Sequence, residues 1–259
     1  MEWARVSAAP VVVSIGANDP WNAAGIGLDL LVLRDLGLRG ATVVAGITAQ
    51  GPEGVRARWP APHEAIVAQL NALAALRIGA YRVGLLLDAD SVRTVARALA
   101  ERDAPVVVDP VFSASRGGAF ADDAVVDAYR LSLIARATLF TPNAYEAARL
   151  VKYAVETPAD AERAARDLLR LGARAVLVKG GHVDGDEIVD VLADGDGITL
   201  LRDRRLTVEM RGTGCILAVC AAAALAQGHD VVEAVMRARH EVRSRMLTAI
   251  ELGGMRVAR

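Results

Sequence analysis

The 259-residue chain has few aromatic residues, which make up 4% of it, although 53% of its residues are hydrophobic. Alanine, valine and leucine must therefore supply most of the apolar surface, which suits helices packed closely on a sheet better than an aromatic-rich all-β core. The net charge is only −1, so no overall field attracts nucleic acid or an anionic membrane. No basic cluster is interleaved with aromatic residues, and this argues against a nucleic-acid partner.

Long hydrophobic runs and a cysteine framework are also missing. The longest apolar run, residues 215–226, is shorter than the roughly 20 residues that cross a bilayer. Residues 1–16 lack the charged and apolar regions of a signal peptide. The two cysteines, Cys215 and Cys220, would lie about 140° apart around a helix, so they form neither a CxxC pair nor a metal site. These features predict a cytoplasmic protein in a reducing setting, without a membrane partner.

Lysine is nearly absent, since the chain has two lysines, Lys152 and Lys179, against 28 arginines. Where any positive charge would serve, this sequence uses arginine, so a lysine is mildly informative. Lys179 opens the segment LysGlyGlyHis (179–182), which follows an expected strand, and it could place a point charge on a phosphate. The alternatives are a solvated lysine at a strand end and an ordinary surface or hydrogen-bonded histidine at His182.

What the chain does have is an alternation of short β-rich runs and longer amphipathic segments. The expected strands are continuous apolar runs, as in parallel strands covered on both faces, and they lie at 11–15, 42–48, 81–86, 105–111, 138–140 and 175–179. The expected helices lie near 25–36, 62–77, 90–102, 121–134, 143–151 and 158–171. This alternation predicts a doubly wound α/β sheet with right-handed crossovers.

The pattern changes after residue 179. Residues 188–193 and 198–201 flank AspGlyAspGly, which is a strong hairpin signal, and residues 205–209 could add a strand. Two long helices are then expected, at 213–227 and 230–252. Because no internal repeat, linker or low-complexity tail interrupts the chain, we expect a single domain over residues 1–259.

Ligands of such sheets bind beyond the carboxyl ends of the strands, so the loops there should hold the chemistry. These loops are residues 16–25, 48–54, 109–118, 141–146 and 179–182. Within them, the small residues 113–118 could form a lid that excludes water, although an ordinary surface loop would look the same.

GlyThrGly at 212–214 precedes an expected helix. Its backbone N–H groups and the helix dipole would suit a phosphate, but a tight strand-to-helix turn would have the same sequence. Cys215 follows in the first helical turn, where the pKa of a thiol is lowered from about 8.5. A thiolate there could accept a proton or orient a hydroxyl. The alternative is a small buried residue, which is also what we expect of Cys220 among its alanines and valines.

Carboxylates stand at two of the expected strand ends. Asp109 and Glu146 could hold Mg²⁺ beside phosphates, because this ion prefers few protein ligands and several waters. Each motif also has a purely structural explanation. Asp109 could be a turn residue before Pro110, and Asn143 with Glu146 could be a helix N-cap with glutamate at the third helical position.

Together and in this order, these motifs resemble the hydroxymethylpyrimidine/phosphomethylpyrimidine kinases of thiamine biosynthesis, within the ribokinase-like superfamily. The similarity runs from about residue 11 to residue 250. Six segments carry it: GANDPWNAAGIGLD (16–29) is similar to AGSDPSGGAGIQAD of that family, TAQ (48–50) to TAQ, DPVFSAS (109–115) to DPVMVA, TPNAYEAARL (141–150) to TPNxxEAxxL, and VKGGH (178–182) and GTGC (212–215) match directly. The resemblance implies a ribokinase-like three-layer α/β/α sandwich with a mostly parallel central sheet, ATP and Mg²⁺ as cofactors, and a homodimer.

The resemblance also implies roles for the matched residues. Cys215 takes the catalytic base position. The other groups that would act on ATP and the transferring phosphoryl group are Gly212, Thr213, Gly214, Lys179 and Asn143, with Asp109 and Glu146 at the metal. Asp29 and Gln50 would read polar atoms of the pyrimidine. The apolar walls of its pocket would be Ala17, Ala24, Leu85 and Val111.

The implied reaction is ATP-dependent phosphorylation of 4-amino-5-hydroxymethyl-2-methylpyrimidine and of its monophosphate. Four departures from the family bear on it: Ala17 replaces a glycine, Trp21-Asn22-Ala23 replaces Ser-Gly-Gly, Arg211 replaces a histidine, and the usual histidine- and glycine-rich tail is absent. We expect Arg211 to add a cation near the phosphates. A pyridoxal or pyridoxine kinase, and a pyrimidine-binding protein without turnover, are the alternatives.

Overall fold

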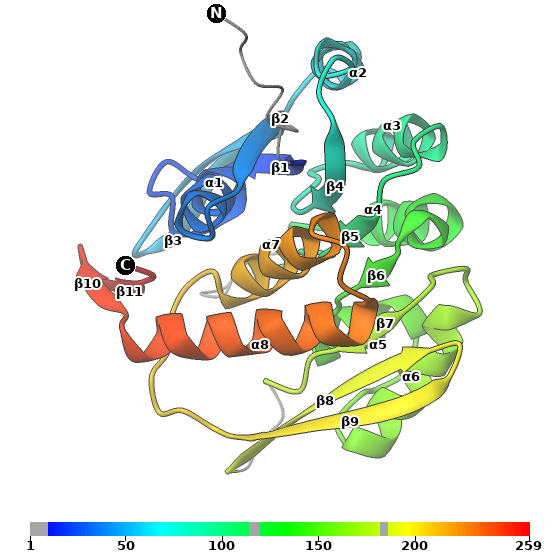
Figure 1. The fold of residues 1–259 in the computed structure, drawn as a ribbon, viewed down its shortest axis with the longest axis vertical. Helices are drawn as coiled ribbons and strands as arrows, with labels where there is room; N and C mark the ends of the chain where they lie inside the picture. Colours follow the sequence, from blue (N-terminus) through cyan, green and yellow to red (C-terminus); the bar gives the residue numbers. More distant parts are fainter. Residues whose placement is uncertain (1–9, 114–119, 182–185) are drawn as a thin grey trace, which may run out of the picture.

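A computed structural model describes residues 10–113, 120–181 and 186–259 of the chain. Its centre is a nine-stranded sheet, drawn in Figure 1. In spatial order the strands are β3 (Gly54–Pro60), β2 (Arg39–Gly51), β1 (Val11–Asn18), β4 (Ile78–Val83), β5 (Val106–Val108), β6 (Leu139–Phe140), β7 (Val176–Val178), β8 (Glu187–Asp194) and β9 (Gly197–Arg204). Neighbours from β2 to β7 are parallel, and β3, β8 and β9 are antiparallel to their neighbours.

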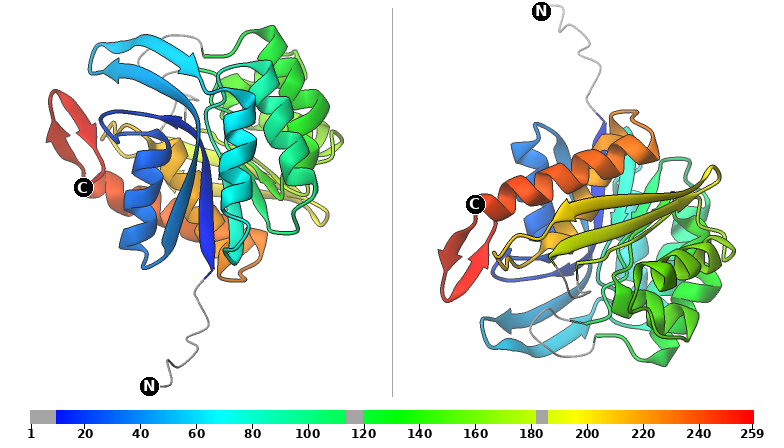
Figure 2. Two further views of the ribbon diagram at one scale, coloured as in Figure 1. Left: turned by 90° about the horizontal axis from the view of Figure 1, so that it is seen from above. Right: turned by 90° about the horizontal axis from the view of Figure 1, so that it is seen from below.

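Helices cover both faces of the sheet (Figure 2). One face carries α1 (Gly25–Asp35), α7 (Thr213–Ala226) and α8 (Val231–Leu247). The other face carries α2 (His63–Ala72), α3 (Ala89–Ala100), α4 (Asp123–Ala128) with its continuation η1 (Tyr129–Leu133) and η2 (Ile134–Arg136), α5 (Ala144–Val151) and α6 (Pro158–Leu169). The predicted three-layer α/β/α sandwich with a mostly parallel sheet is thus confirmed.

The pleat of the strands divides the core in two. Val11, Val13 and Ile15 of β1 pack with the layer of α2 to α6, while Val12 packs with the layer of α1, α7 and α8. Since each parallel strand is apolar on both faces, the continuous apolar runs in the sequence are explained. Where the order reverses, between β1 and β4, loops of both halves meet, and such a switch point is where ligands of these sheets bind.

Helix α7 lies directly on the sheet, with α8 outside it (Figure 1). Every residue from Cys215 to Leu225 is buried. Alanine fills much of this helix because its small side chain lets the helix approach the strands closely. The amino end of α7 is thereby held over the carboxyl edge of the sheet.

Three details differ from the sequence-based expectation. Residues 48–54, expected as a loop, close a β2–β3 hairpin, because the alternating side chains of β3 suit an edge strand. Residues 205–209 form no strand. The last helix ends at Leu247, and a hairpin of β10 (Ile250–Leu252) and β11 (Met255–Val257) follows. Its tip is Gly253–Gly254, whose φ angles of 54° and 80° are left-handed, as tight hairpin turns require. The AspGlyAspGly hairpin between β8 and β9 is confirmed.

No helix within the three described ranges is long and apolar enough to cross a membrane.

Candidate active site

The amino end of α7 presses against the loop that leads into α1. Gly212 has φ 79°, which is left-handed backbone, and a Cβ there would lie 2.4 Å from the carbonyl oxygen of Ala23. A larger residue at this position would therefore strain the backbone and collide with that loop. Gly212 fixes how α7 begins, and so where its first N–H groups lie.

The second glycine of this motif faces charged side chains. A Cβ at Gly214 would lie 3.3 Å from Lys179 Nζ and 3.7 Å from each carboxylate oxygen of Asp109. These three residues belong to three separate sequence motifs, and the structure brings them together. Because Gly214 has no side chain, space remains beside Lys179, and a ligand could approach the helix terminus closely there.

Behind Lys179 lies a buried chain of alternating charges. Lys179 Nζ donates to Asp109 Oδ1 at 2.8 Å, and Arg82 Nη2 donates to Asp109 Oδ2 at 3.2 Å. Arg82 Nη1 lies 3.2 Å from Asp29 Oδ2, which also accepts a hydrogen bond from Ser14. The side chains of Arg82 and Asp29 are fully buried. The charges of two cations and two carboxylates thus neutralise one another at a place that is too buried for water to solvate them.

This pairing sets the ionisation of the chain. Burial acts to raise the pKa of Asp109, but Lys179 and Arg82 outweigh it and hold that pKa below its usual value. Burial likewise acts to lower the pKa of Lys179, but Asp109 and Glu146 raise it. Burial dominates at Asp29, whose pKa rises to about 6 in spite of Arg82 and Ser14. Near neutral pH Lys179 is therefore cationic, and Asp109 is a carboxylate.

Arg82 is a site residue that none of the sequence motifs indicated. It is an arginine inside the otherwise apolar strand β4, followed two residues later by Gly84. A Cβ at Gly84 would lie 1.9 Å from Arg82 Nη1, so that glycine makes room for the guanidinium. A charge within a strand that is apolar on both faces was the available signal, because a fully buried arginine needs partners.

The side chains of Asp29 and Arg211 contact other groups than the sequence predicted. Asp29 was expected to read the pyrimidine directly, but it is fully buried against Arg82 and Ser14. Arg211 was expected near the phosphates, but its guanidinium donates to Gln50 Oε1 at 2.6 Å and to the carbonyl oxygen of Gly51 at 3.1 Å. Arg211 thus faces the end of β2.

Cys215 is buried close to Arg82, with a hydrogen bond from the backbone N–H of Gly25. Burial raises the pKa of this thiol above its ordinary value, although Arg82 and the Gly25 N–H act to lower it. The expectation of a lowered pKa at the helix terminus is therefore wrong, because desolvation outweighs the effects of Arg82 and the Gly25 N–H. Cys215 is a neutral thiol at neutral pH. Burial also raises the pKa of Cys220, to about 12.

Asn143 and Glu146 form the capping box of α5. Asn143 Oδ1 accepts from the N–H of Glu146 at 2.9 Å, and Glu146 Oε2 accepts from the N–H of Asn143 at 2.7 Å. The loop adjoins β7, since the N–H of Lys179 donates to the carbonyl oxygen of Pro142 at 2.8 Å. Burial raises the pKa of Glu146 to about 7, with Lys179 acting in the opposite direction.

Asp109 and Glu146 could supply only part of the ligand set of a magnesium ion. Asp109 already accepts from Lys179 and Arg82, and Glu146 from its own helix cap. Within the described residues no group of three or more His, Cys, Asp or Glu side chains is placed to hold a metal. Oxygen donors of this kind, few in number, are what Mg²⁺ takes from a protein when it keeps several waters.

Three of the four predicted wall residues gather at the switch point. Ala17, Leu85 and Val111 belong to one apolar cluster at the ends of β1, β4 and β5. Val55 of β3, the register partner of Gln50, packs against the same cluster. Ala24 packs instead against the core beneath α7. The cluster and Gln50 thus lie at one end of the site, and Lys179 lies at the other.

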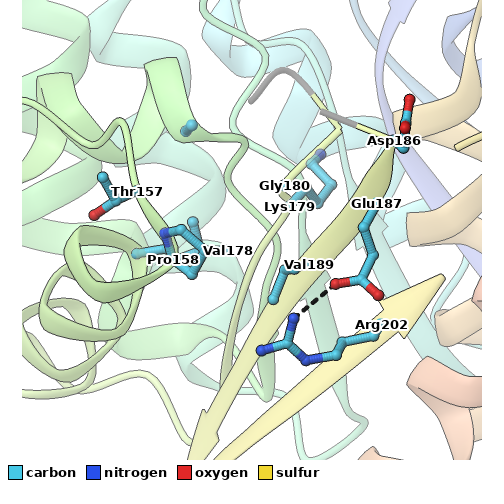
Figure 3. Close-up of a pocket in the computed structure, with 11 residues that line it drawn as sticks. Thr157, Pro158, Val178, Lys179, Gly180, Asp186, Glu187, Val189 and Arg202 are labelled. Carbon is cyan, nitrogen blue, oxygen red and sulfur yellow. Dashed lines mark hydrogen bonds and ion pairs between the residues drawn. The ribbon is translucent and has the colours of Figure 1, made fainter. Parts of the chain in front are cut away.

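A pocket of about 370 Å³ opens on the α6 side of β8, next to the end of β7. Figure 3 shows Lys179 and Gly180 at one side of it and an ion pair between Arg202 Nη1 and Glu187 Oε2, 2.7 Å long, at another. Lys179 is the one predicted site residue in its lining. Of the predicted lid, residues 114–118 lie outside the described residues, and so does His182.

The family model described as phosphomethylpyrimidine kinase matches residues 19–258. A hydroxymethylpyrimidine/phosphomethylpyrimidine kinase from Streptomyces coelicolor is 38% identical over 95% of this chain and 91% of its own length. Its counterpart from Rhizobium meliloti is 37% identical over 88% of this chain and 87% of its own length.

Solved structures agree with this relationship. An ADP complex of Bacillus subtilis pyridoxal kinase superimposes with a TM-score of 0.90 at 26% identity, over 97% of each chain. A phosphomethylpyrimidine kinase from Clostridium difficile superimposes with a TM-score of 0.80 at 26% identity, over 91% of this chain and 98% of its own. The family model and the close relatives both span nearly the whole sequence. This chain therefore belongs to the phosphomethylpyrimidine kinase family.

Proposed function

We propose that this protein transfers the γ-phosphoryl group of ATP to the primary alcohol of 4-amino-5-hydroxymethyl-2-methylpyrimidine, and then to the monophosphate, in the cytoplasm. The single observation that carries the proposal is the approach of Gly214 to Lys179 and Asp109 at the amino end of α7. Two relatives that are similar over most of the chain are kinases of this name, and a structural neighbour binds ADP.

The amino end of α7 would receive the negative charge of the transferring phosphoryl group. Unpaired N–H groups and the helix dipole favour an anion there, and Lys179 adds a cation whose counter-ion, Asp109, is already in place. Phosphoryl transfer passes through a loose transition state, so positioning and charge stabilisation matter more than a strong base. Fixed dipoles aimed at developing charge supply this without reorganisation.

Cys215 would hold the substrate hydroxyl in line. A thiol whose pKa is raised by burial is protonated at neutral pH and cannot act as a ready base. It can exchange hydrogen bonds with a hydroxyl, and it lies one residue after the glycine that faces Lys179. Orientation is sufficient, because a near-attack arrangement by itself removes much of the barrier.

Asp109 and Glu146 would contact Mg²⁺ through water, with the nucleotide phosphates as its main ligands. Once bound, the ion would neutralise phosphate charge. The raised pKa of Glu146 means that a nearby cation would draw off its proton and improve it as a partner. Asn143 would contribute its backbone and amide at the same loop.

A homodimer is part of the proposal. Ile47 and Trp59 are register partners on the β2–β3 hairpin, and their exposed fractions are 54% and 55%. Two large apolar side chains beside each other at an edge are suited to burial in an interface. Analytical ultracentrifugation of the wild type and of Trp59→Asp tests this, and a wild type that is monomeric at micromolar concentration contradicts it.

The decisive experiment measures transfer from γ-labelled ATP to a panel of alcohols: the hydroxymethylpyrimidine, its monophosphate, pyridoxal and pyridoxine. We expect both pyrimidines to be phosphorylated with the highest kcat/KM. Preference for pyridoxal would make the protein a pyridoxal kinase, an alternative that the Bacillus subtilis neighbour supports. Pyrimidine binding by calorimetry without transfer would indicate a binding protein.

A further inference from the structure

Arg211 and Gln50 form a side-chain pair that joins the residue before the α7 glycines to the end of β2. Arg211 Nη2 donates to Gln50 Oε1 at 2.6 Å, across 161 positions of sequence. Gln50 is half-buried, and its register partner Val55 packs against the apolar cluster of Ala17 and Leu85. The pair therefore stands at the edge of the proposed ring pocket.

The guanidinium of Arg211 is fixed in place from several sides. Nη1 donates to the carbonyl oxygen of Gly51 at 3.1 Å and contacts Met255 Sδ at 3.3 Å. The backbone N–H of Arg211 donates to the carbonyl oxygen of Arg256 at 3.0 Å. Two of these partners belong to the C-terminal hairpin, which thus braces Arg211 against β2.

Trp21 adds a second brace. A Cβ at Gly253, in the hairpin tip, would lie 2.7 Å from the Trp21 ring, and a Cβ at Gly51 would lie 3.5 Å from Trp21 Nε1. The indole therefore lies between the hairpin and the end of β2. Trp21 and Arg211, two departures from the family pattern, converge with the hairpin on the strand end that holds Gln50.

An arginine side chain has five N–H donors and no acceptor, whereas an amide has one acceptor oxygen and one donor NH₂ group. Only the oxygen of Gln50 can therefore face Arg211. The Nε2 group is the other branch of the amide, and among the described residues it makes no hydrogen bond. With Oε1 engaged by Arg211, Nε2 is the group that Gln50 presents to a ligand.

We propose that Arg211 is a specificity-determining residue, which locks the Gln50 amide as a hydrogen-bond donor and so selects heteroaromatic alcohols with an unprotonated ring nitrogen at that position. This inference rests on the proposed function. A pyrimidine nitrogen accepts from Nε2. A ring C–H at the same place leaves Nε2 unpaired, and a ring N–H places two donors against each other. A ligand with either group in place of the ring nitrogen would therefore bind more weakly.

The test compares four variants with the wild type in the same kinase assay. Arg211→Met removes the donors, Arg211→Lys keeps a positive charge and one donor atom, and Gln50→Glu replaces Nε2 by an oxygen of the same size. Arg237→Met is the matched control, because Arg237 pairs only with Glu233 on the exposed side of α8 in the described structure. KM for pyrimidine, KM for ATP and kcat are measured separately, and calorimetry gives pyrimidine affinity without turnover.

We expect Arg211→Met to raise KM and Kd for the hydroxymethylpyrimidine roughly 5- to 100-fold, the range for a hydrogen bond lost at a buried polar group. KM for ATP and kcat should change little, Arg211→Lys should recover part of the loss, and the control should match the wild type. Gln50→Glu should weaken the pyrimidine as well, since Arg211 would hold one carboxylate oxygen and leave the other facing the ring nitrogen.

Other results overturn the inference. Unchanged pyrimidine Kd in both Gln50→Glu and Arg211→Met would show that the amide does not read the ring. A fall in kcat with a raised KM for ATP would place Arg211 at the phosphates. If the wild type transfers no phosphate, the proposed function fails, but the calorimetric series still decides the role of Arg211. If the wild type binds no pyrimidine either, both ideas are refuted.

Discussion

The two ends of the site are built on different principles. At the charged end (Asp29, Arg82, Asp109 and Lys179), buried ions compensate one another with almost no access to solvent. At the hairpin end (Trp21, Gln50, Arg211 and the β10–β11 hairpin), half-buried groups meet through hydrogen bonds and packing. Removing a partner from the first leaves an ion stranded, whereas in the second water can replace much of what is lost.

The two ends of the site also differ in how closely their residues match the family motifs. The motifs with Asp109, Lys179 and the α7 glycines agree with the family pattern, and so does Gln50 in ThrAlaGln, whereas Trp21 and Arg211 beside Gln50 depart from it. Charge stabilisation of a phosphoryl group imposes the same demands whatever the acceptor alcohol. Ring recognition depends on the alcohol.

The largest expected effect is on stability at the charged end. Arg82→Met leaves Asp29 and Asp109 buried with one cation fewer, and removing one partner of a buried pair costs about 3–5 kcal/mol. Chemical denaturation of the variant should show this loss. Arg237→Met, at an exposed pair, should lose no more than about 1 kcal/mol. Equal stability of the two variants would mean that the buried carboxylates do not need Arg82.

Lys179→Ala should have the next largest effect, on turnover. Removing one preorganised group that stabilises developing charge lowers kcat roughly 10²–10³-fold, while pyrimidine binding at the other end should persist. Lys152→Ala is the control, because Lys152 is the other lysine of the chain and lies exposed near Asp127. If the two lysine variants turn over alike, Lys179 is merely a structural partner of Asp109.

Cys215 tests whether a thiolate is needed. With orientation as its role, Cys215→Ser should retain more activity than Cys215→Ala, whose kcat should fall by roughly 10–100-fold, below the usual range for loss of a general base. Iodoacetamide should modify Cys215 slowly at neutral pH and faster as the pH rises, since burial raises its pKa. Cys220→Ser should keep full turnover. Equal, severe losses in the serine and alanine variants would restore a thiolate base.

The smallest expected effect is a pH dependence at Glu146. Its pKa rises from 4.5 to about 7 on folding, so the folded state binds the extra proton between these values. The stability that Glu146 contributes is present below pH 4.5 and is lost as the pH rises through 7. Residue 146 stays neutral in Glu146→Gln. Between pH 4.5 and 7 the free energy of unfolding of the wild type should therefore fall relative to that of the variant. A difference that is constant with pH would show that Glu146 ionises normally.

Local rules explain why much of this architecture could be predicted. Apolar runs predicted the central strands, and the AspGlyAspGly signal predicted the β8–β9 hairpin. The sequence predicted neither edge strand β3 nor the C-terminal hairpin. Residues 48–54 favoured a loop, residues 55–60 gave no strand signal, and the last helical pattern ran to residue 252. The GlyGly pair at 253–254 was the available clue to the C-terminal hairpin.

The sequence by itself determined the sheet and the meeting of its motifs, since residues that follow parallel strands must gather at one edge. Lys179 and Asp109 came together for that reason, and Gly214 meets them from the start of α7. Only the tertiary structure decided what each group became. Burial and ion pairing depend on residues brought from far along the chain. They made Cys215 a neutral thiol, buried Asp29 against Arg82, and paired Arg211 with Gln50.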